Sequence, residues 1–348
     1  MNILVTGGLG AIGTVLVEEL RRRGHGVWLC DLSHHHDPQY IRCDVAEYRQ
    51  LERIFDHHRF EMVYHLAAEF GRWNGEDFYE TLWRSNVIGT KNVIRLQEKH
   101  RFRHVFFSTS EVYGDWDGVM REDVMDLYEV RQLNDYAITK WAGEMQVMNS
   151  AQMAGTETVR VRLFNVYGPG EKYSNYRSVN CLFCYRALHD LPYTVYLQHH
   201  RCATYVTDAV RTLANIADTF IPGEVYNIGS TEYRDIKTVS DLVLRHLGKD
   251  DRRVTYERLE PFTTRDKKVD VGKAERDLGH CPRVPLAVGL ARTLEWMRRY
   301  YAPPEKLSVI PVVASQVVRT TAAAHSSAKH AACRAGRRSQ RHGLVVGG

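Results

Sequence analysis

Short apolar runs alternate with longer amphipathic stretches through the first half of the chain. The apolar runs are short enough to be buried parallel strands, and they lie at residues 2–5, 26–30, 61–66, 104–107 and 158–163. The amphipathic stretches carry apolar residues at helical spacing, and they lie at residues 14–23, 78–99 and 136–154. This alternation predicts an α/β fold, in which helices cover both faces of a doubly wound parallel sheet.

Beyond about Gly168 the pattern is less regular. Short strands are predicted at residues 194–196, 203–206 and 225–228, and helices at 241–247 and 286–301. We therefore expect a first domain over residues 1–168 and a smaller, partly interwoven domain over 169–301. The segment 302–348 carries two helix-ending prolines near its start and is then rich in Ala, Ser, Arg and His. We expect it to be a disordered, dispensable tail.

The charge of the chain is unevenly distributed, and its net value of +5 is therefore misleading. From Lys306 onward there are seven Lys and Arg and no acid, so the rest of the chain carries 40 basic and 42 acidic residues. That balance gives no reason to expect a nucleic-acid partner. No apolar stretch reaches the length of a membrane span, and a strand is predicted from residue 2. We expect no membrane segment, no leader and a cytoplasmic location.

The cysteines and histidines do not form a metal-binding pattern. The seven cysteines are scattered, with a single CxxC at Cys181 and Cys184, and many of the seventeen histidines are adjacent in sequence. Adjacent side chains diverge on a helix and alternate on a strand, so they do not share a ligand face. We expect packed thiols, surface histidines and no metal site.

The stretch after the first strand carries the strongest chemical signal. Glycines stand at Gly7, Gly10 and Gly13, with Ala11 and Ile12 between the last two, and a predicted helix follows. Glycines permit a tight turn, a close approach of the backbone to a pyrophosphate, and close packing of helix on strand. The amides and positive dipole end of the helix then hold the anion. This order of elements predicts a dinucleotide-binding loop.

Two acidic residues extend this prediction to a particular dinucleotide. Asp31 ends the second strand, eighteen residues after Gly13, where a carboxylate can accept both ribose hydroxyls and would repel a 2′-phosphate. A third strand at residues 40–43 ends at Asp44 and Val45, where an adenine edge could lie. We therefore predict NAD rather than NADP as the cofactor.

Candidate catalytic residues follow the strand at 104–107 and begin the helix at 136. Ser108, Thr109, Ser110 and Glu111 lie at the carboxyl end of a parallel strand, where such sheets bind ligands. Tyr136 and Lys140 are four residues apart and share one helix face. A tyrosinate could take a proton from a substrate hydroxyl while hydride leaves the same carbon. A neighbouring ammonium and a cationic nicotinamide would both favour that phenolate.

Together these residues resemble the nucleotide-sugar epimerase/dehydratase family of the extended short-chain dehydrogenase/reductases. The resemblance covers about residues 1–300. Besides the sites above, it rests on His65-Leu66-Ala67-Ala68, Asn86-Val87-Ile88-Gly89-Thr90, residues 162–169, 201–208 and 226–229. It implies a Rossmann-type sheet, a C-terminal substrate domain, a homodimer, and tightly held NAD that oxidises C4 of a nucleotide-diphosphate sugar. It also assigns Leu66, Ala67, Ala68, Asn86 and Ser108 to the cofactor, Lys140 to the nicotinamide ribose, and Thr109 to the substrate oxygen.

The resemblance leaves several reactions open. A 4-keto sugar permits loss of a 6-substituent, loss of a carboxylate, or return of hydride to the other face. The triplet Thr109-Ser110-Glu111 is similar to that of UDP-glucuronate decarboxylases and GDP-mannose 4,6-dehydratases, and Glu111 is a candidate base at C5. Our first expectation is a 4,6-dehydratase. A UDP-glucuronate decarboxylase, a 4-epimerase and a non-catalytic dinucleotide sensor are the alternatives.

Four further residues are expected at the sugar nucleotide. Arg72 lies in the loop that faces the sugar in relatives, and Asn165 belongs to the Asn-Val-Tyr-Gly-Pro landmark. Arg201 begins the landmark at 201–208, which departs from the usual pattern by reading Arg-Cys-Ala. A further Arg before the last helical region is Arg258 or Arg265, and we choose Arg265 for the site.

Overall fold

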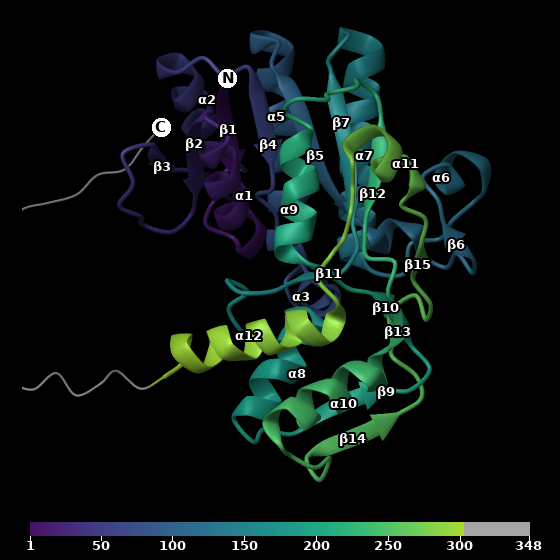
Figure 1. The fold of residues 1–348 in the computed structure, drawn as a ribbon. Coiled ribbons are helices and arrows are strands. Elements are labelled where there is room, and N and C mark those ends of the chain that lie inside the picture. Colours follow the sequence, from purple (N-terminus) through teal and green to yellow (C-terminus); the bar gives the residue numbers. More distant parts are fainter. Residues whose placement is uncertain (303–348) are drawn as a thin grey trace, which may run out of the picture. The chain divides into compact units, whose positions relative to one another are not determined.

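The computed structural model describes residues 1–302 and contains a seven-stranded parallel sheet (Figure 1). The order across the sheet is β12-β7-β5-β4-β1-β2-β3. The strands are β1 (Asn2–Thr6), β2 (Gly26–Asp31), β3 (Tyr40–Arg42), β4 (Met62–His65), β5 (Arg103–Thr109), β7 (Thr158–Leu163) and β12 (Val225–Ile228). The order reverses between β1 and β4, and this reversal leaves a crevice at the carboxyl ends of the central strands.

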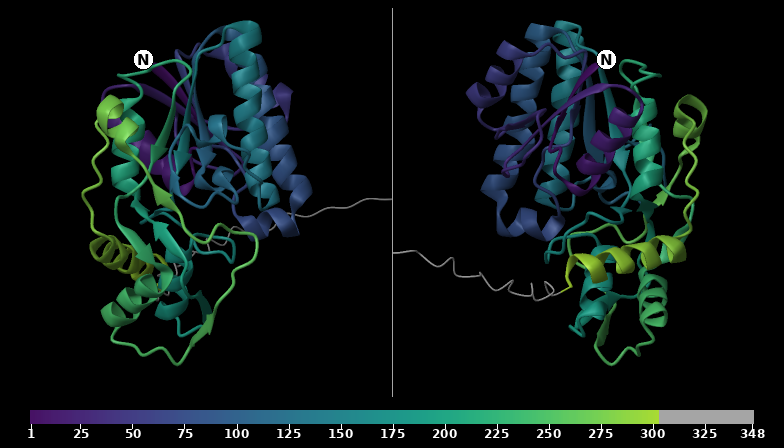
Figure 2. Two further views of the ribbon diagram at one scale, coloured as in Figure 1. Left: turned by 90° about the vertical axis from the view of Figure 1, so that its right-hand side faces the viewer. Right: turned by 60° about the vertical axis from the view of Figure 1, so that its left-hand side comes forward.

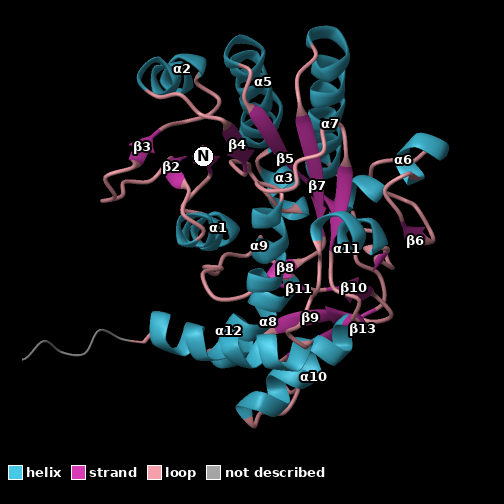
Figure 3. Ribbon diagram, turned by 45° about the horizontal axis from the view of Figure 1, so that its top comes forward, coloured by secondary structure: helices cyan, strands magenta, loops and turns pink. Residues whose placement is uncertain are grey.

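Helices cover both faces of this sheet (Figure 3). One face carries α1 (Ala11–Arg22), α9 (Val206–Asn215) and α11 (Gly272–Leu278), and the other carries α2 (Tyr48–His57), α5 (Gly89–His100) and α7 (Asp135–Ala154). Alternation along β1 explains the two layers, because Ile3 and Val5 enter the core under α1 whereas Leu4 enters the core under α2 and α5. The predicted doubly wound α/β fold is confirmed.

A second apolar core lies beyond the carboxyl ends of the strands (Figure 2). It is formed by α8 (Val179–Leu188), α10 (Ile236–Leu247), α12 (Leu286–Tyr300), β9 (Tyr193–Tyr196) and β14 (Val254–Glu257). The chain also forms short strand pairs: β8 (Val166–Tyr167) with β11 (Thr204–Tyr205), β10 (His200–Cys202) with β13 (Tyr233–Asp235), and β6 (Val119–Met120) with β15 (Lys268–Val269).

The chain passes back and forth between these two cores. After α8 and β9 it returns to the sheet as α9 and β12, and after α10 and β14 it returns again as α11. All of this lies within one compact unit over residues 1–302. Among the described helices, none combines the length and apolar character that crossing a membrane requires.

Most of the predicted elements are present, with shifts of a few residues at their ends. The predicted helix over 78–99 is broken into α4 (Tyr79–Trp83), a π-helical turn η1 (Arg84–Ile88) and α5. The sequence pattern did not predict α2, α8, α9 and α11, nor the short α3 (Arg72–Asp77), η2 (Ser110–Tyr113) and α6 (Val124–Leu127). The prediction for the tail falls on residues 303–348, which lie outside the described residues.

Candidate active site

The glycine loop joins β1 to α1 and is built for a close approach of backbone to ligand. Gly7 has a φ of 70°, and a Cβ on it would lie 2.6 Å from the amide nitrogen of Ala67. A Cβ on Gly13 would overlap the carbonyl oxygen of Gly7. The helix N-cap is Gly10, which has no side chain to cap the first-turn amides. The amides therefore face the cavity, where they can hold a pyrophosphate.

Asp31 is fixed beside this loop at the end of β2. Its carboxylate accepts a hydrogen bond from the amide of Leu9 at 3.1 Å and one from the amide of Leu32 at 2.7 Å. Asp44 and Val45, which follow β3, line the same cavity. Both acidic residues that were predicted from sequence therefore line the cavity, and Asp31 contacts the glycine loop directly. Within the described residues, no cluster of three or more His, Cys, Asp and Glu is arranged to hold a metal ion.

The predicted loop after β4 also lines the cavity, but Asn86 lies behind it. Leu66, Ala67 and Ala68 are lining residues. The Asn86 side chain is 2% exposed, and it exchanges hydrogen bonds of 2.9 and 3.0 Å with the backbone of Glu69. It also donates to the Thr139 hydroxyl at 3.0 Å. The structure thus places Asn86 as a brace that ties this loop to α7.

The catalytic candidates converge at the centre of the cavity, whose volume is about 1360 Å³. Thr109, Ser110 and Glu111 reach it from the end of β5, and Tyr136 and Lys140 reach it from α7. The Lys140 ammonium donates to the carbonyl oxygen of Phe107 at 2.9 Å. Burial lowers the pKa of Lys140 to about 8 and raises the pKa of Tyr136 above its ordinary value. A cationic ligand beside the phenol would therefore be needed to favour the tyrosinate.

A buried network of ionic and hydrogen-bonding side chains lies next to the carboxyl end of β5. The Ser108 hydroxyl donates to Glu144 at 2.5 Å, and the Arg162 guanidinium donates to the same carboxylate at 2.8 and 3.0 Å. Arg162 also donates to the Tyr113 hydroxyl at 3.0 Å. Glu144 is fully buried, and the Arg162 guanidinium helps to lower the carboxylate's pKa against the opposing effect of burial. The Ser108 hydroxyl thus donates its hydrogen bond to Glu144 and not into the cavity, where a cofactor contact was expected.

Charged side chains surround Glu111 at the sugar end of the cavity. Lys267 donates a short hydrogen bond to Glu111, and Arg72 Nε lies 4.0 Å from the same oxygen. Burial alone would raise the pKa of Glu111, but Lys267 and Arg72 outweigh it and hold that pKa below its usual range. Burial lowers the pKa of Lys267 to about 8 even though Glu111 opposes the shift. Glu111 is therefore ionised at neutral pH.

Glu260 is the second carboxylate of this group. It accepts a hydrogen bond from Arg72 Nη2 at 2.6 Å, and Arg201 Nη2 lies 3.6 Å away. Arg72, Arg201, Lys267, Glu111 and Glu260 form what we call the sugar-site charge cluster. Its three cations and two carboxylates leave one positive charge in excess in a largely buried setting.

Of the two remaining residues predicted at the sugar site, Asn165 lines the cavity and Arg265 does not. Asn165 lines the cavity with a φ of 41°, and its buried Oδ1 has no hydrogen-bond partner among the described residues. Arg265 is exposed, does not line the cavity and donates to the carbonyl oxygen of Gln198 at 2.9 Å. From the same segment, the structure brings Glu260 to the cavity wall and buries Lys267 against Glu111.

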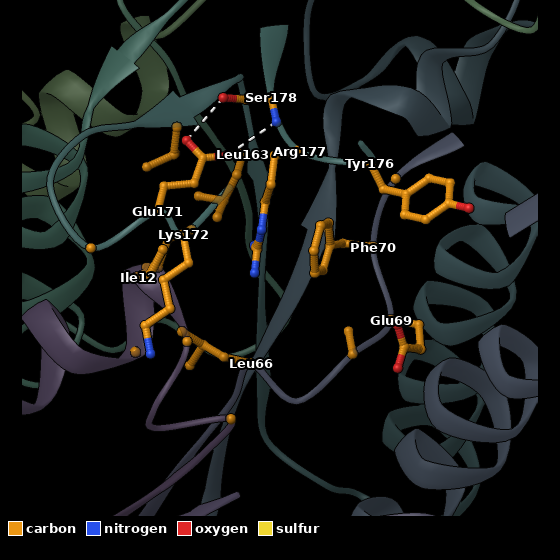
Figure 4. A pocket seen from close by; sticks show the side chains of 18 of the residues that line it. Ile12, Leu66, Glu69, Phe70, Leu163, Glu171, Lys172, Tyr176, Arg177 and Ser178 are labelled. Carbon is orange, nitrogen blue, oxygen red and sulfur yellow. Dashed lines mark hydrogen bonds between the residues drawn. The ribbon is translucent and has the colours of Figure 1, made fainter. Parts of the chain in front are cut away.

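A further cation reaches into the cavity from the loop before α8 (Figure 4). The Arg177 guanidinium lies 3.9 Å from the ring centroid of Phe70, and Lys172 lines the same cavity (Figure 4). Glu171 accepts hydrogen bonds from the amide and hydroxyl of Ser178, and this contact fixes the loop. Arg177, Glu260 and Lys267 were not predicted from the sequence. No motif marks them, and only the high charge of residues 257–268 could have drawn notice to the latter two.

Comparison with known proteins identifies the class to which this fold and site belong. The profile of the "NAD dependent epimerase/dehydratase family" matches residues 3–229. A UDP-N-acetyl-alpha-D-glucosaminuronate decarboxylase from Bacillus cytotoxicus is 31% identical over 316 residues, which cover 85% of this chain and 97% of the relative. A dTDP-glucose 4,6-dehydratase from Salmonella typhimurium is 26% identical, with 85% of this chain and 92% of the relative covered.

Solved structures agree with this assignment. A UDP-glucose 4-epimerase from Thermotoga maritima, solved with UDP-glucose, superposes with a TM-score of 0.78 at 28% identity and covers 86% of this chain and 99% of its own. MoeE5, solved with UDP-glucuronic acid and NAD, superposes with a TM-score of 0.76 at 29% identity and covers 86% and 100%. The fold and site are those of an NAD-dependent enzyme of nucleotide sugars. The chain belongs to the NAD dependent epimerase/dehydratase family, and the predicted resemblance is confirmed.

The family's cofactor is NAD, and the residues of this chain fit it. The backbone is tightly packed at Gly7 and Gly13, where a Cβ would collide with backbone atoms, and the loop presents the start of α1 to an anion. Asp31 stands beside that loop with a carboxylate that can accept ribose hydroxyls. The prediction of NAD as cofactor is confirmed.

Proposed function

We propose that the enzyme decarboxylates a nucleotide-diphosphate uronic acid after oxidation at C4 of the sugar. The observation that carries this proposal is the sugar-site charge cluster, whose excess positive charge lies beside the catalytic candidates. A buried excess charge is costly unless a ligand pairs with it. A C6 carboxylate would equalise the charges, whereas a neutral C6 hydroxymethyl group would not. The 31% identical relative with a uronate decarboxylase activity in its name supports the same choice.

The proposed roles of the residues follow from their positions. Bound NAD supplies the oxidation at C4 and the later re-reduction. Tyr136 takes the proton of the C4 hydroxyl, and the Lys140 ammonium favours the phenolate. Thr109, whose hydroxyl adjoins the phenol, holds the same sugar oxygen.

Loss of the carboxylate uses the charged end of the cavity. Arg72 and Lys267 would bind the C6 carboxylate, which is placed β to the C4 ketone. The C5–C6 bond breaks, carbon dioxide leaves, and the electron pair moves to the C4 oxygen, where Tyr136 and Thr109 stabilise it. Lys267 then returns a proton to C5, a role for which its pKa of about 8 is suited. Glu111 stays ionised and orients Lys267.

A 4,6-dehydratase is the second candidate, and Glu111 is the observation in its favour. An ionised carboxylate near C5 can remove the proton there, and Lys267 could assist departure of the 6-hydroxyl as water. The relatives with this activity in their names are less similar to the chain, at 26–27% identity. A 4-epimerase needs neither Glu111 nor Lys267 for proton transfer at C5.

Mass spectrometry of the products separates these reactions. We would incubate the purified protein with UDP-, GDP-, dTDP- and CDP-linked hexoses and uronic acids. Decarboxylation removes about 44 mass units, dehydration about 18, and epimerisation none. We expect loss of carbon dioxide from a uronic acid and no change with the Tyr136→Phe variant as control. Loss of water from a neutral hexose, with every uronic acid left intact, would replace this proposal by the dehydratase.

We also propose that the protein is a homodimer through the outer faces of α4, η1 and α7. These elements, with Phe78 at the start of α4, expose large apolar side chains: Phe78, Tyr79, Trp83, Ile88, Ile138 and Met145. Such a patch is typical of an interface, and a two-fold axis would bury it against its own copy. Light scattering at micromolar concentration should give a dimer mass. We expect the Met145→Asp variant to shift it toward the monomer, and a wild-type monomer would contradict the proposal.

A further inference from the structure

The segment 258–266, between β14 and β15, forms a strap over the sugar end of the cavity. The Asn134 side chain donates to the carbonyl oxygen of Phe262 at 3.0 Å, and the Phe262 ring packs edge-on against Trp73 with centroids 5.4 Å apart. Phe262 has a φ of 58°, which is uncommon for a bulky residue. The Thr264 hydroxyl donates to the carbonyl oxygen of Gly114. The strap is therefore fastened just after Glu260, whose carboxylate contacts Arg72 and lies near Arg201 in the charge cluster.

The two arginines near Glu260 differ in how many hydrogen bonds their guanidinium groups donate to other protein groups. The Arg201 guanidinium donates to the carbonyl oxygens of His200 and Arg265 at 2.9 and 2.8 Å, and to the Thr263 hydroxyl at 3.2 Å. Arg72 makes its short contact with Glu260 and a longer one of 3.4 Å with the carbonyl oxygen of Pro261. Arg72 is thus the arginine whose main partner is a carboxylate that a ligand could replace.

Glu260 stands in the position that an anionic ligand group would take. Its Oε1 lies 2.6 Å from Arg72 Nη2, in the geometry of a charge-assisted hydrogen bond. Glu111 lies on the other side of the same guanidinium, 4.0 Å from its Nε. A sugar carboxylate that approached Glu111 and Lys267 would therefore compete with Glu260 for Arg72.

We propose that Glu260 is a specificity-determining residue, a built-in carboxylate that occupies Arg72 until the C6 carboxylate of the substrate displaces it. This inference rests on the proposed function, because it takes the substrate to be a uronic acid. A neutral sugar leaves the Arg72–Glu260 pair intact and receives no ionic contact from Arg72. After carbon dioxide has left, Glu260 returns to Arg72, and the product loses its hold on that arginine. The residue thus lowers affinity for the acid and leaves affinity for the neutral product unchanged.

Calorimetry on the full chain saturated with NAD tests the inference. We would titrate the Tyr136→Phe protein, with and without Glu260→Gln, with UDP-glucuronic acid and with its decarboxylated counterpart UDP-xylose. Removing an internal competitor should tighten binding of UDP-glucuronic acid by about tenfold and leave UDP-xylose within about twofold. Glu257→Gln, which alters an exposed carboxylate at the end of β14, is the matched control and should change neither.

A merely structural role for Glu260 predicts another result. If Glu260 only anchors Arg72 and the strap, Glu260→Gln weakens both ligands equally, and that outcome overturns the inference, as does an unchanged affinity for both. Glu260→Asp keeps the charge and serves if Glu260→Gln lowers the melting temperature. It should bind UDP-glucuronic acid more weakly than Glu260→Gln does. These readouts are affinities, so a protein that selects the acid but releases no carbon dioxide would contradict the proposed function and leave this inference standing.

Discussion

The two ends of the cavity recognise their ligands by different means. The cofactor end is made of backbone: the loop from Gly7 to Gly13 and the start of α1, with Asp31 as its main charged side chain. The sugar end is made of side chains, and the five members of its charge cluster come from four separated segments of the chain. The backbone site requires positions without side chains, so that the ligand can approach the amides. The side-chain site requires a particular balance of positive and negative charges.

This difference separates cofactor binding, which needs only a short glycine motif, from sugar recognition, which can vary with single charged residues. Pyrophosphate binding needs amides and open space, which a short glycine motif supplies wherever it follows a strand. Discrimination between sugars needs charges at defined places, and these can be exchanged one at a time without disturbing the fold. We therefore expect substitutions at the two ends to affect different ligands, and the following predictions test that separation.

The largest effect is expected where the two ends meet, at Tyr136. The Tyr136→Phe change removes one hydroxyl and little packing, so turnover should fall by about a thousandfold or more because a general base is lost. Binding of NAD and of the nucleotide sugar should remain close to wild type in calorimetry. A variant that retained a tenth of the activity would show that another group takes the proton.

The next effect concerns the backbone end alone. In Gly13→Ala the new Cβ would overlap the carbonyl oxygen of Gly7, and relief of that overlap at a typical cost of 1–3 kcal/mol should weaken NAD by about 10- to 100-fold. Nucleotide-sugar affinity should be nearly unchanged. Gly24→Asn is the control, because nothing lies within 4 Å of a Cβ there. Equal loss of both ligands would mean that the ends are not separable.

Asp31 provides a smaller effect at the same end. Asp31→Asn removes the charge that repels a 2′-phosphate but keeps a hydrogen-bonding side chain beside Leu9. The ratio of NADP to NAD dissociation constants should fall by about tenfold, since hydrogen bonds to charged groups contribute about 1.5–3 kcal/mol. If wild-type protein binds NADP as tightly as NAD, the role assigned to Asp31 is wrong.

The smallest predicted effect is a pH dependence at the side-chain end. Lys267, with a pKa lowered by burial to about 8, is charged below that pH and loses its charge as the pH rises through it. Affinity for UDP-glucuronic acid should therefore weaken by about three- to tenfold between pH 7 and pH 9. Lys267→Arg keeps its charge over this range and should flatten the profile. If the affinity of the wild-type protein does not change with pH, cations other than Lys267 bind the substrate carboxylate.

The same contrast explains what the sequence could predict. The sheet strands, the glycine loop and Asp31 were predictable because each is encoded within one short segment, as β7 shows by matching residues 158–163. The helix predicted at 78–99 was interrupted by the π-helical turn η1, whose local pattern does not differ from that of an α-helix.

Contacts between distant segments were not predictable. Lys267 and Glu111 are 156 positions apart, and Arg72 and Glu260 are 188 apart. Nothing local distinguishes Lys267 from Arg265, which the sequence analysis chose and which the fold turns toward Gln198. The fold buries Lys267 against Glu111 and leaves Arg265 exposed, two positions away, and no local pattern encodes that difference.

The late return of β12 to the sheet affects synthesis of the protein. In the finished fold β7 is held between β5 and β12, and its backbone pairs on both sides. During translation β5 is made before β7, but residues 164–224 must follow β7 before β12 can emerge. Over that interval β7 is an unprotected edge whose mainly buried side chains and free amides invite pairing with another nascent chain. The order of the strands along the chain thus sets the time during which aggregation competes with folding. That time ends only when residues 225–228 leave the ribosome and pair with β7.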